Sequence, residues 1–272
     1  MKRRKIFEGF DETGTPDMKY YAFDWDDNIL EMPTKIILQD DEGDDVPMST
    51  EDFAHYRGKL DSKEPFEYEG HTVVGLSSDA FKYFRVTGDK NFIVDAMIAK
   101  TGPAWPDFVE AINGGSIFSI VTARGHTPSV MRDAVYNFIA SNHKGIDSNE
   151  LVKNLEKYRD LTDSGQLSKK EMIDEYLDLC KFYPVTYGSG SATNPEQGKI
   201  DALTEFVDYI KKMSRFLKKK AYLKNDISNS EPQIGFSDDD LRNLEKVKSH
   251  FGNDPDNIIK TISTHGGIKK DY

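Results

Sequence analysis

The chain has 272 residues, of which 37% are hydrophobic and 31% charged, as is typical of a globular protein with one large domain or a core carrying an inserted module. Its formal net charge of −11 disfavours non-specific binding to nucleic acid, and no apolar run approaches membrane-spanning length, so we expect no membrane partner. The single cysteine, Cys180, excludes an intrachain disulfide and favours a reducing, cytoplasmic setting.

Five apolar or β-rich segments predict the strands of one sheet, at 19–24, 117–122, 182–187, 233–237 and 259–264. Helical patterns separate most of them, which indicates an α/β fold with a Rossmann-like, mainly parallel sheet flanked by helices. Helix starts are expected at Thr127-Pro128, at Asn194-Pro195 and at two capping boxes, 147–150 and 168–171.

Residues 30–106 interrupt this alternation. An acidic turn at 40–45 separates two short β-rich runs, which predicts a hairpin, and the stretch that follows is rich in aromatic residues. We therefore expect 30–106 to form a flap or cap inserted after the first strand. Residues 1–29 and 107–272 would then form the core.

The most informative motif follows the first predicted strand, where Asp24 and Asp26 end the run Tyr-Tyr-Ala-Phe. Groups at the carboxyl ends of parallel strands project into the crevice where open α/β sheets bind ligands. Two nearby carboxylates can divide the roles of nucleophile and general acid–base, or they can share a hard cation such as Mg²⁺. The motif therefore indicates a candidate catalytic or metal site.

Two further signals could contact a phosphate group. Thr122 ends the second predicted strand, and the turn after it, which includes Ala123 and Arg124, opens a helix whose amides favour anions. Lys199 lies near the start of another predicted helix, where its ammonium could balance a carboxylate nucleophile and a phosphate. In the predicted insertion, Lys82 and Arg85 are candidate contacts for a substrate's leaving group.

A fourth signal is the run Asp238-Asp-Asp240, which ends the strand at 233–237. Carboxylates at the ends of two separate parallel strands can converge on one Mg²⁺. One of the three aspartates is also expected to cap the helix that follows. The sequence leaves open whether Asp239 or Asp240 is the second acid of the site.

In this order, the four signals resemble the motifs of the haloacid dehalogenase-like (HAD-like) superfamily. The run Asp24-Trp-Asp-Asp-Asn28 is similar to its Asp-x-Asp-x-Thr motif, with Asn28 in place of the threonine. Thr122 and Lys199 resemble its second-motif hydroxyl and third-motif lysine. Asp238 and Asp239 resemble its fourth-motif acids.

The resemblance implies a Mg²⁺-dependent phosphatase that hydrolyses a small phosphomonoester through an aspartyl-phosphate. Asp24 would attack phosphorus, and Asp26 would act as general acid and base; an acid at position 26 favours phosphatases over dehalogenases and ion-pumping ATPases. Mg²⁺ would be held by Asp24, Asp26 (through its carbonyl), Asp238 and Asp239. The expected substrate contacts are Asn28, Thr122, Ala123, Arg124 and Lys199.

Two other functions stay open. A basic cluster at 211–224 could serve a phosphatase that acts on nucleotides or nucleic-acid ends, although a solvated helix face is the favoured explanation of the cluster. The chain could also be a catalytically inert binding or regulatory protein that keeps the fold. The spacing at 160–171 resembles a calcium loop, but the capping box at 168–171 explains those residues more simply.

Overall fold

The computed structural model describes residues 19–162, 165–188, 194–222, 232–252 and 258–272, without the side chains of 158–162 and 217–222. Its main sheet has six strands in the order β12-β11-β10-β1-β8-β9. They are β1 (Lys19–Phe23), β8 (Phe118–Thr122), β9 (Lys181–Pro184), β10 (Gln233–Asp238), β11 (Ile259–Ser263) and β12 (Lys270–Asp271). Only β12 pairs antiparallel with its neighbour, so the prediction of an α/β fold with a mainly parallel sheet is confirmed.

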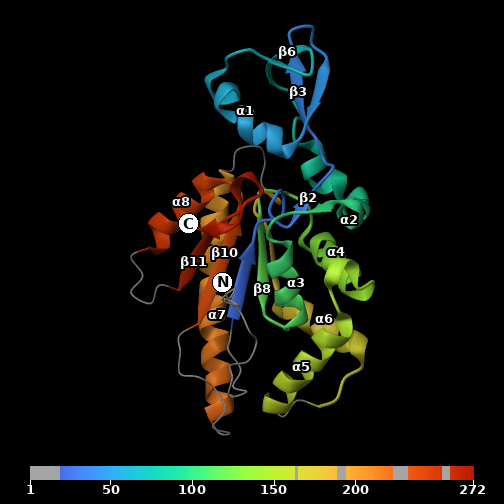
Figure 1. The fold of residues 1–272 in the computed structure, drawn as a ribbon, viewed down its shortest axis with the longest axis vertical. Helices are drawn as coiled ribbons and strands as arrows, with labels where there is room; N and C mark the ends of the chain where they lie inside the picture. Colours follow the sequence, from blue (N-terminus) through green and yellow to red (C-terminus); the bar gives the residue numbers. More distant parts are fainter. Residues whose placement is uncertain (1–18, 163–164, 189–193, 223–231, 253–257) are drawn as a thin grey trace, which may run out of the picture.

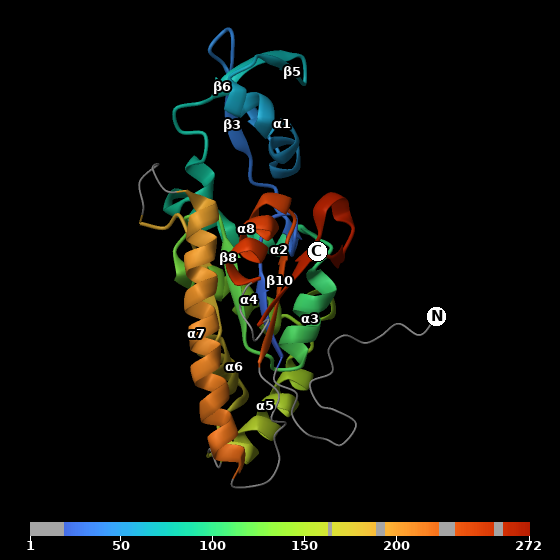
Figure 2. The ribbon, with the colours of Figure 1, turned by 90° about the vertical axis from the view of Figure 1, so that its left-hand side faces the viewer.

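Helices cover both faces of this sheet because β1 is apolar on both sides (Figures 1 and 2). Tyr21 and Phe23 pack into one core with the helices α3 (Trp105–Asn113), α4 (Pro128–Ala140), α5 (Ser148–Thr162) and α6 (Lys169–Leu179). Tyr20 and Ala22 point the other way and pack with α7 (Pro195–Tyr222) and α8 (Leu241–Phe251). Successive strand residues alternate between faces, so a buried parallel strand must be apolar throughout.

Three predicted helix starts have the expected hydrogen bonds. Ser168 and Glu171 form a complete capping box at α6. Asp147 accepts from the backbone at the start of α5, and Asn194 does so at α7. The calcium-like spacing therefore overlaps a capping box, while the side chains at 160–164 lie outside the described residues.

The chain between β1 and α3 builds a second, antiparallel sheet, in the order β4-β3-β6-β5. Its strands are β3 (Ile36–Asp40), β4 (Asp45–Met48), β5 (Phe66–Tyr68) and β6 (His71–Leu76), and α1 (Thr50–Ser62) packs on them. We call residues 36–76 the antiparallel module. It has a hydrophobic core of its own and lies beyond the carboxyl ends of the main strands (Figure 1). The hairpin predicted around 40–45 is β3–β4.

The segment that stands apart from the main sheet is shorter than 30–106. Helix α2 (Asp89–Ile98) packs against α4, and its Phe92 and Ala96 belong to the core of the main sheet. The chain leaves and re-enters through the antiparallel pair β2 (Leu30–Glu31) and β7 (Lys100–Thr101). Short 3₁₀ turns complete the fold: η1 (Lys82–Phe84), η2 (Val86–Gly88), η3 (His143–Gly145) and η4 (His265–Gly267).

Membrane-spanning helices are absent from the part of the chain that the structure describes, since none of its helices is both long and apolar enough to cross a bilayer. Cys180 follows α6 and is buried, and this burial raises the pKa of its thiol to about 12. A thiol in this state is a poor nucleophile, which is the behaviour of a core residue.

Asn28 ties the carboxyl end of β1 to β10 and β11. Its amide nitrogen donates to the carbonyl of Asp24 at 3.0 Å and to the hydroxyl of Ser237 at 3.0 Å, and its Oδ1 accepts from the Thr264 hydroxyl at 2.8 Å. All four residues are buried. The side chain therefore fixes the three strand ends relative to one another.

Replacing this amide tests its structural role. We expect Asn28→Ala to lower the free energy of unfolding by about 2–4 kcal/mol, because buried donors and acceptors lose their partner. Urea denaturation measures the change. Asn137→Ala, on the exposed face of α4, is the control and should change stability by less than about 0.5 kcal/mol. Equal effects of the two substitutions would contradict this role.

Candidate active site

Chain topology brings three predicted site residues to one edge of the main sheet. Strands β8 and β9 lie on one side of β1, and β10 and β11 lie on the other. The carboxyl edge at β1 is therefore a topological switch point, where open α/β sheets form ligand crevices. Asp24 follows β1, Thr122 ends β8 and Asp238 ends β10. All three line a cavity of about 410 Å³.

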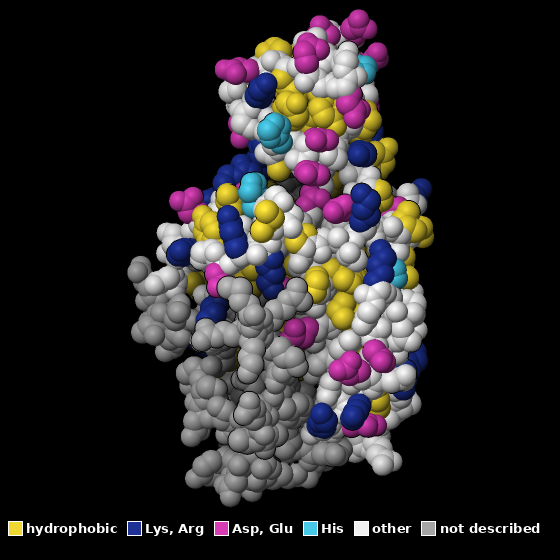
Figure 3. Space-filling model, in the orientation of Figure 1, with side chains coloured by type: hydrophobic (Ala, Val, Ile, Leu, Met, Phe, Trp, Pro, Cys, Tyr) yellow, Lys and Arg dark blue, Asp and Glu magenta, His cyan; other side chains and the backbone are white. Residues whose placement is uncertain are grey.

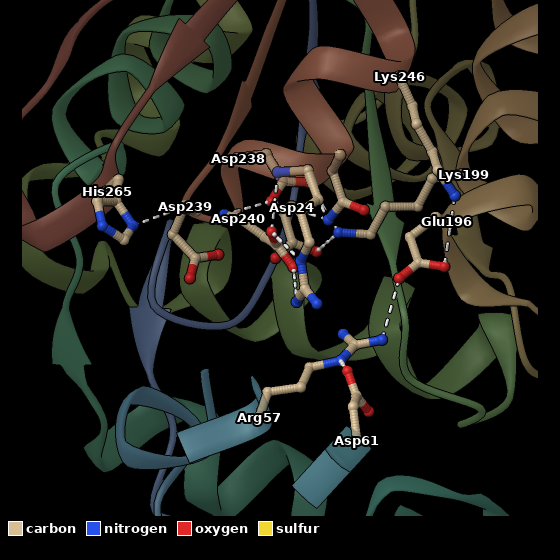
Figure 4. Close-up of polar contacts among 12 residues, drawn as sticks. Asp24, Arg57, Asp61, Glu196, Lys199, Asp238, Asp239, Asp240, Lys246 and His265 are labelled. Carbon is tan, nitrogen blue, oxygen red and sulfur yellow. Dashed lines mark hydrogen bonds and ion pairs between the residues drawn. The ribbon is translucent and has the colours of Figure 1, made fainter. Parts of the chain in front are cut away.

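Lys199 reaches this edge from the first turns of α7 and is 3% exposed. Its Nζ lies 2.8 Å from Asp238 Oδ2 and 3.0 Å from Asp24 Oδ1 (Figure 4). Burial lowers the pKa of Lys199, but the attraction of Asp238 and Asp24 outweighs it and raises that pKa. Lys199 is therefore a buried ammonium that bridges two carboxylates.

The ammonium of Lys199 does not fully compensate the negative charge of the buried Asp24 carboxylate. Burial, opposed by Lys199 and reinforced by Asp238 and Asp26, raises the pKa of Asp24 from 3.8 to about 8. Its Oδ1 makes the ion pair with Lys199 but no hydrogen bond of good geometry. A carboxylate in this position gains from a further cation or from a proton.

The site residues fit a hard divalent cation. Asp24, Asp238 and Asp239 offer carboxylate oxygens that all lie within 4.8 Å of one another. Burial and then repulsion from Asp238 and Asp24 raise the pKa of Asp239 well above its usual value. Three carboxylates thus face one ammonium, and oxygen ligands with excess negative charge suit Mg²⁺.

The structure also separates the two acids that follow Asp238. Asp240 is the N-cap of α8, accepting from the backbone N–H of Arg242 and pairing with its guanidinium at 2.7 Å. Asp239 belongs to the carboxylate cluster, and its backbone carbonyl faces His265 Nδ1 at 3.1 Å (Figure 4). The helix cap therefore occupies Asp240 and leaves Asp239 for the site.

Asp26 lines the cavity but does not join the carboxylate cluster. The Arg124 guanidinium donates to both of its oxygens, from Nε at 2.8 Å and from Nη2 at 2.6 Å. Arg124 is 1% exposed, and it stacks over the ring of Phe84, 4.5 Å from the centroid. The guanidinium of Arg124, which the sequence predicts to contact substrate, instead forms a bidentate ion pair that holds the Asp26 carboxylate in place.

Arg124 also connects the two chain segments that flank the antiparallel module. Its Nη2 donates to Thr34 Oγ1 at 3.1 Å, before the module, and its Nη1 lies 3.1 Å from His126 Nε2. Because arginine can only donate, His126 Nε2 accepts, so its Nδ1 carries the proton donated to Asp89 at 2.8 Å, beyond the module. Burial and the neighbouring Arg124 lower the pKa of His126, in keeping with a neutral ring.

The remaining predicted contacts are divided between the cavity and the protein interior. Thr122 Oγ1 accepts from the backbone N–H of Arg124 at 3.3 Å, which leaves its own proton available to a ligand. Ala123 lines the cavity beside it. Asn28 is absent from the lining, and among the described residues its side chain bonds only to Asp24, Ser237 and Thr264, so it serves as a tie between strand ends. Trp25 packs against Phe92, away from the cavity.

Several lining residues were not predicted from the sequence. Arg57, on α1, pairs with Glu196 of α7 at 3.0 Å across the cavity (Figure 4). Asn243 donates to both oxygens of Asp238 at 3.1 Å. Asp27 has a positive φ of 53°, and burial raises its pKa to about 7. Asp27 lies inside the motif at 24–28, and Asn243 was within reach of sequence reasoning because the first turn of a helix lies beside its N-cap.

Comparisons of the chain with protein-family models, with curated proteins and with solved structures each found no match. The likeness to the haloacid dehalogenase-like superfamily thus remains the resemblance of its motifs.

A double-mutant cycle tests the pair of Asp26 and Arg124. We expect Arg124→Leu to destabilise the protein by about 3 kcal/mol, because it strands a partly buried carboxylate. Adding Asp26→Asn should recover about 1–2 kcal/mol of that loss. The control is Arg132→Leu, whose ion pairs with α6 are on the surface and should contribute less than about 1 kcal/mol. Strictly additive effects on unfolding would contradict the pairing.

The carboxylate cluster predicts how pH and metal affect stability. The raised pKa of Asp24 means that the folded state binds this proton more tightly than the unfolded chain does. Metal-free stability should therefore fall as pH rises from 3.8 towards 8, and Mg²⁺ should raise the Tm more at high pH, where it need not displace a proton.

Thermal melts with Asp239→Asn check this account. Removing one repelling carboxylate should raise the metal-free Tm near pH 8 by about 2–4 °C and abolish the increase caused by Mg²⁺. Asp208→Asn, on the exposed side of α7, should behave as wild type. A Mg²⁺-induced increase that survives Asp239→Asn would place the metal elsewhere.

Proposed function

We propose that the chain is a Mg²⁺-dependent phosphatase that hydrolyses a phosphomonoester through an aspartyl-phosphate. The observation that carries the proposal is the buried bridge of Lys199 between Asp24 and Asp238, with Asp239 beside it, at the switch point of the sheet. Transfer of a phosphoryl group depends mainly on positioning and on stabilising its negative charge. The clustered carboxylates, the Lys199 ammonium and the Thr122 hydroxyl lie at one edge of the sheet and meet both requirements.

In the first step, a carboxylate oxygen of Asp24 forms a bond to phosphorus and the ester P–O bond breaks. Asp26 protonates the departing oxygen, which leaves as an alcohol. Lys199 and the Thr122 hydroxyl stabilise the phosphoryl oxygens. Arg124 keeps the Asp26 carboxylate at the cavity, since it holds both oxygens.

In the second step, Asp26 takes a proton from water, which attacks the phosphorus of the aspartyl-phosphate. The P–O bond to Asp24 breaks, so that the carboxylate is restored and inorganic phosphate is released. Asp24, Asp238 and Asp239, with the backbone carbonyl of Asp26 by the family resemblance, would hold Mg²⁺. When bound there, Mg²⁺ supplies positive charge to the phosphoryl oxygens.

The proposal includes a Rossmann-like core with the antiparallel module as its cap. The ion pair of Arg57 with Glu196 joins the module to the core across the cavity, and Glu196 also lies 3.7 Å from Lys246. Such lids exclude water from a phosphorylated intermediate. The inserted segment would be 30–106, of which α2 packs on the core.

The basic cluster at 211–224 favours no second function. Lys211 is twelve residues after Lys199 on one continuous helix, which places it about 18 Å further along the axis. Helix α7 runs away from the module along the body of the molecule (Figure 2). A single nucleotide could not bridge the two, while Lys224 and the side chains of 218–220 lie outside the described residues.

Phosphate release tests the function directly. The purified protein should release phosphate from an aryl phosphate only with Mg²⁺, and Asp24→Asn should lower the rate by at least about a thousandfold, because the nucleophile is lost. Asp208→Asn is the matched control and should retain full activity. Both variants should melt cooperatively, which excludes unfolding as the cause.

Two outcomes would count against the proposal. Equal turnover by Asp24→Asn would rule out Asp24 as nucleophile. A wild-type protein that binds Mg²⁺ and forms a beryllium-fluoride adduct at Asp24, yet hydrolyses no member of a phosphomonoester panel, would indicate an inert binding protein that keeps the fold.

A further inference from the structure

The module side of the cavity carries a cluster of apolar and aromatic side chains next to the polar Thr50, Arg57 and Asp61. It includes Phe53 and Phe81, whose centroids are 5.7 Å apart and whose planes are nearly perpendicular. Phe84 continues the cluster, 6.1 Å from Phe81, and Ile36 and Leu76 line the same cavity. Edge-to-face rings of this kind present a continuous surface to a flat apolar group.

This wall lies on the module side of the cavity. The view in Figure 3 shows hydrophobic side chains gathered on the module and charged side chains where the module meets the body of the protein. Leu76, one of the lining residues, is 44% exposed. An apolar surface left open beside a charged site is the usual sign of a ligand-binding wall.

The cations of the cavity provide a second, independent observation. Five cationic side chains line it, and four of them pair with carboxylates that also line it: Arg57, Arg124, Lys199 and Arg242. The fifth, Arg85, makes no side-chain hydrogen bond or ion pair with any residue that the structure describes. Its backbone is held in place by a bridge to Gly125. Arg85 is thus a cationic lining residue whose side chain has no ionic partner among the described residues.

We propose that the leaving group of the substrate is an aromatic ring that carries a carboxylate. The ring packs against Phe53, Phe81 and Phe84, while the carboxylate pairs with Arg85. This inference rests on the proposed function for the phosphate end of the substrate. A cavity of about 410 Å³ is of the size that holds a small molecule.

A sugar or polyol phosphate fits this wall poorly. Its hydroxyl groups would lie against phenylalanine rings and aliphatic side chains, where they would lose water without gaining hydrogen bonds. Two polar side chains of the opposite wall are already paired, Glu196 with Arg57 and Asp240 with Arg242. The chemistry therefore favours an anionic aryl phosphate over a carbohydrate phosphate.

Non-hydrolysable phosphonates test the proposal by binding alone. Differences in the intrinsic reactivity of the corresponding phosphate esters therefore do not affect the result. Calorimetry with Mg²⁺ present should give the tightest binding for 4-carboxybenzylphosphonate. Benzylphosphonate should bind about tenfold more weakly, because it lacks the charged hydrogen bond, and 3-hydroxypropylphosphonate should bind more weakly still.

Two pairs of variants assign the preference to the named residues. Arg85→Gln should remove the advantage of the carboxylate and leave benzylphosphonate unchanged, whereas Lys82→Gln, which does not line the cavity, should have no effect. Phe81→Ala should weaken both aromatic ligands about tenfold, and Tyr83→Ala, an exposed neighbour on η1, should not.

Parallel turnover assays separate this inference from the proposed function. Tight binding of 4-carboxybenzylphosphonate without hydrolysis of any phosphomonoester would sustain the ligand class and overturn the phosphatase. Hydrolysis combined with equal binding of all three phosphonates would sustain the phosphatase and overturn the inference. A loss of preference in Lys82→Gln as large as that in Arg85→Gln would also overturn it.

Discussion

The candidate site depends on one buried ion bridge, the ammonium of Lys199 between Asp24 and Asp238. Removing charged groups from water is unfavourable unless they are paired, and the two carboxylates would repel each other if the lysine were absent. The parallel register of β1 with β10 and the arrival of α7 at the carboxyl edge bring the three charges together. The fold thus places these charges together at the edge of the sheet where we propose that a phosphoryl group binds.

A second buried cation, Arg124, links the site to the antiparallel module. It holds Asp26 and contacts Thr34 before the module, and through His126 it connects to Asp89 beyond it. The position of the proposed acid–base residue and the position of the proposed cap are therefore set by the same guanidinium. A displacement of either flanking segment would shift the Asp26 carboxylate, because these contacts are short and buried or partly buried.

Local patterns in the sequence predicted the strands of the main sheet and the polar residues at their carboxyl ends. Asp24, Thr122 and Asp238 could be expected at one edge, because apolar runs predict parallel strands whose carboxyl ends meet. Nothing in the sequence of 89–98 distinguishes this helix from the rest of 30–106, although its Phe92 packs on the core of the main sheet. The chain offers no local signal for the Arg124–Asp26 pair, which spans 98 residues, or for Arg57 with Glu196, which spans 139.

The central claim is that Asp24 becomes phosphorylated. Turnover of an aryl phosphate, quenched with acid and followed by borohydride reduction, converts an aspartyl-phosphate into homoserine, which peptide mass spectrometry can locate. The account predicts homoserine at position 24 alone, and only after turnover with Mg²⁺. Steady phosphate release with an unmodified Asp24, or modification of a different carboxylate, would contradict it.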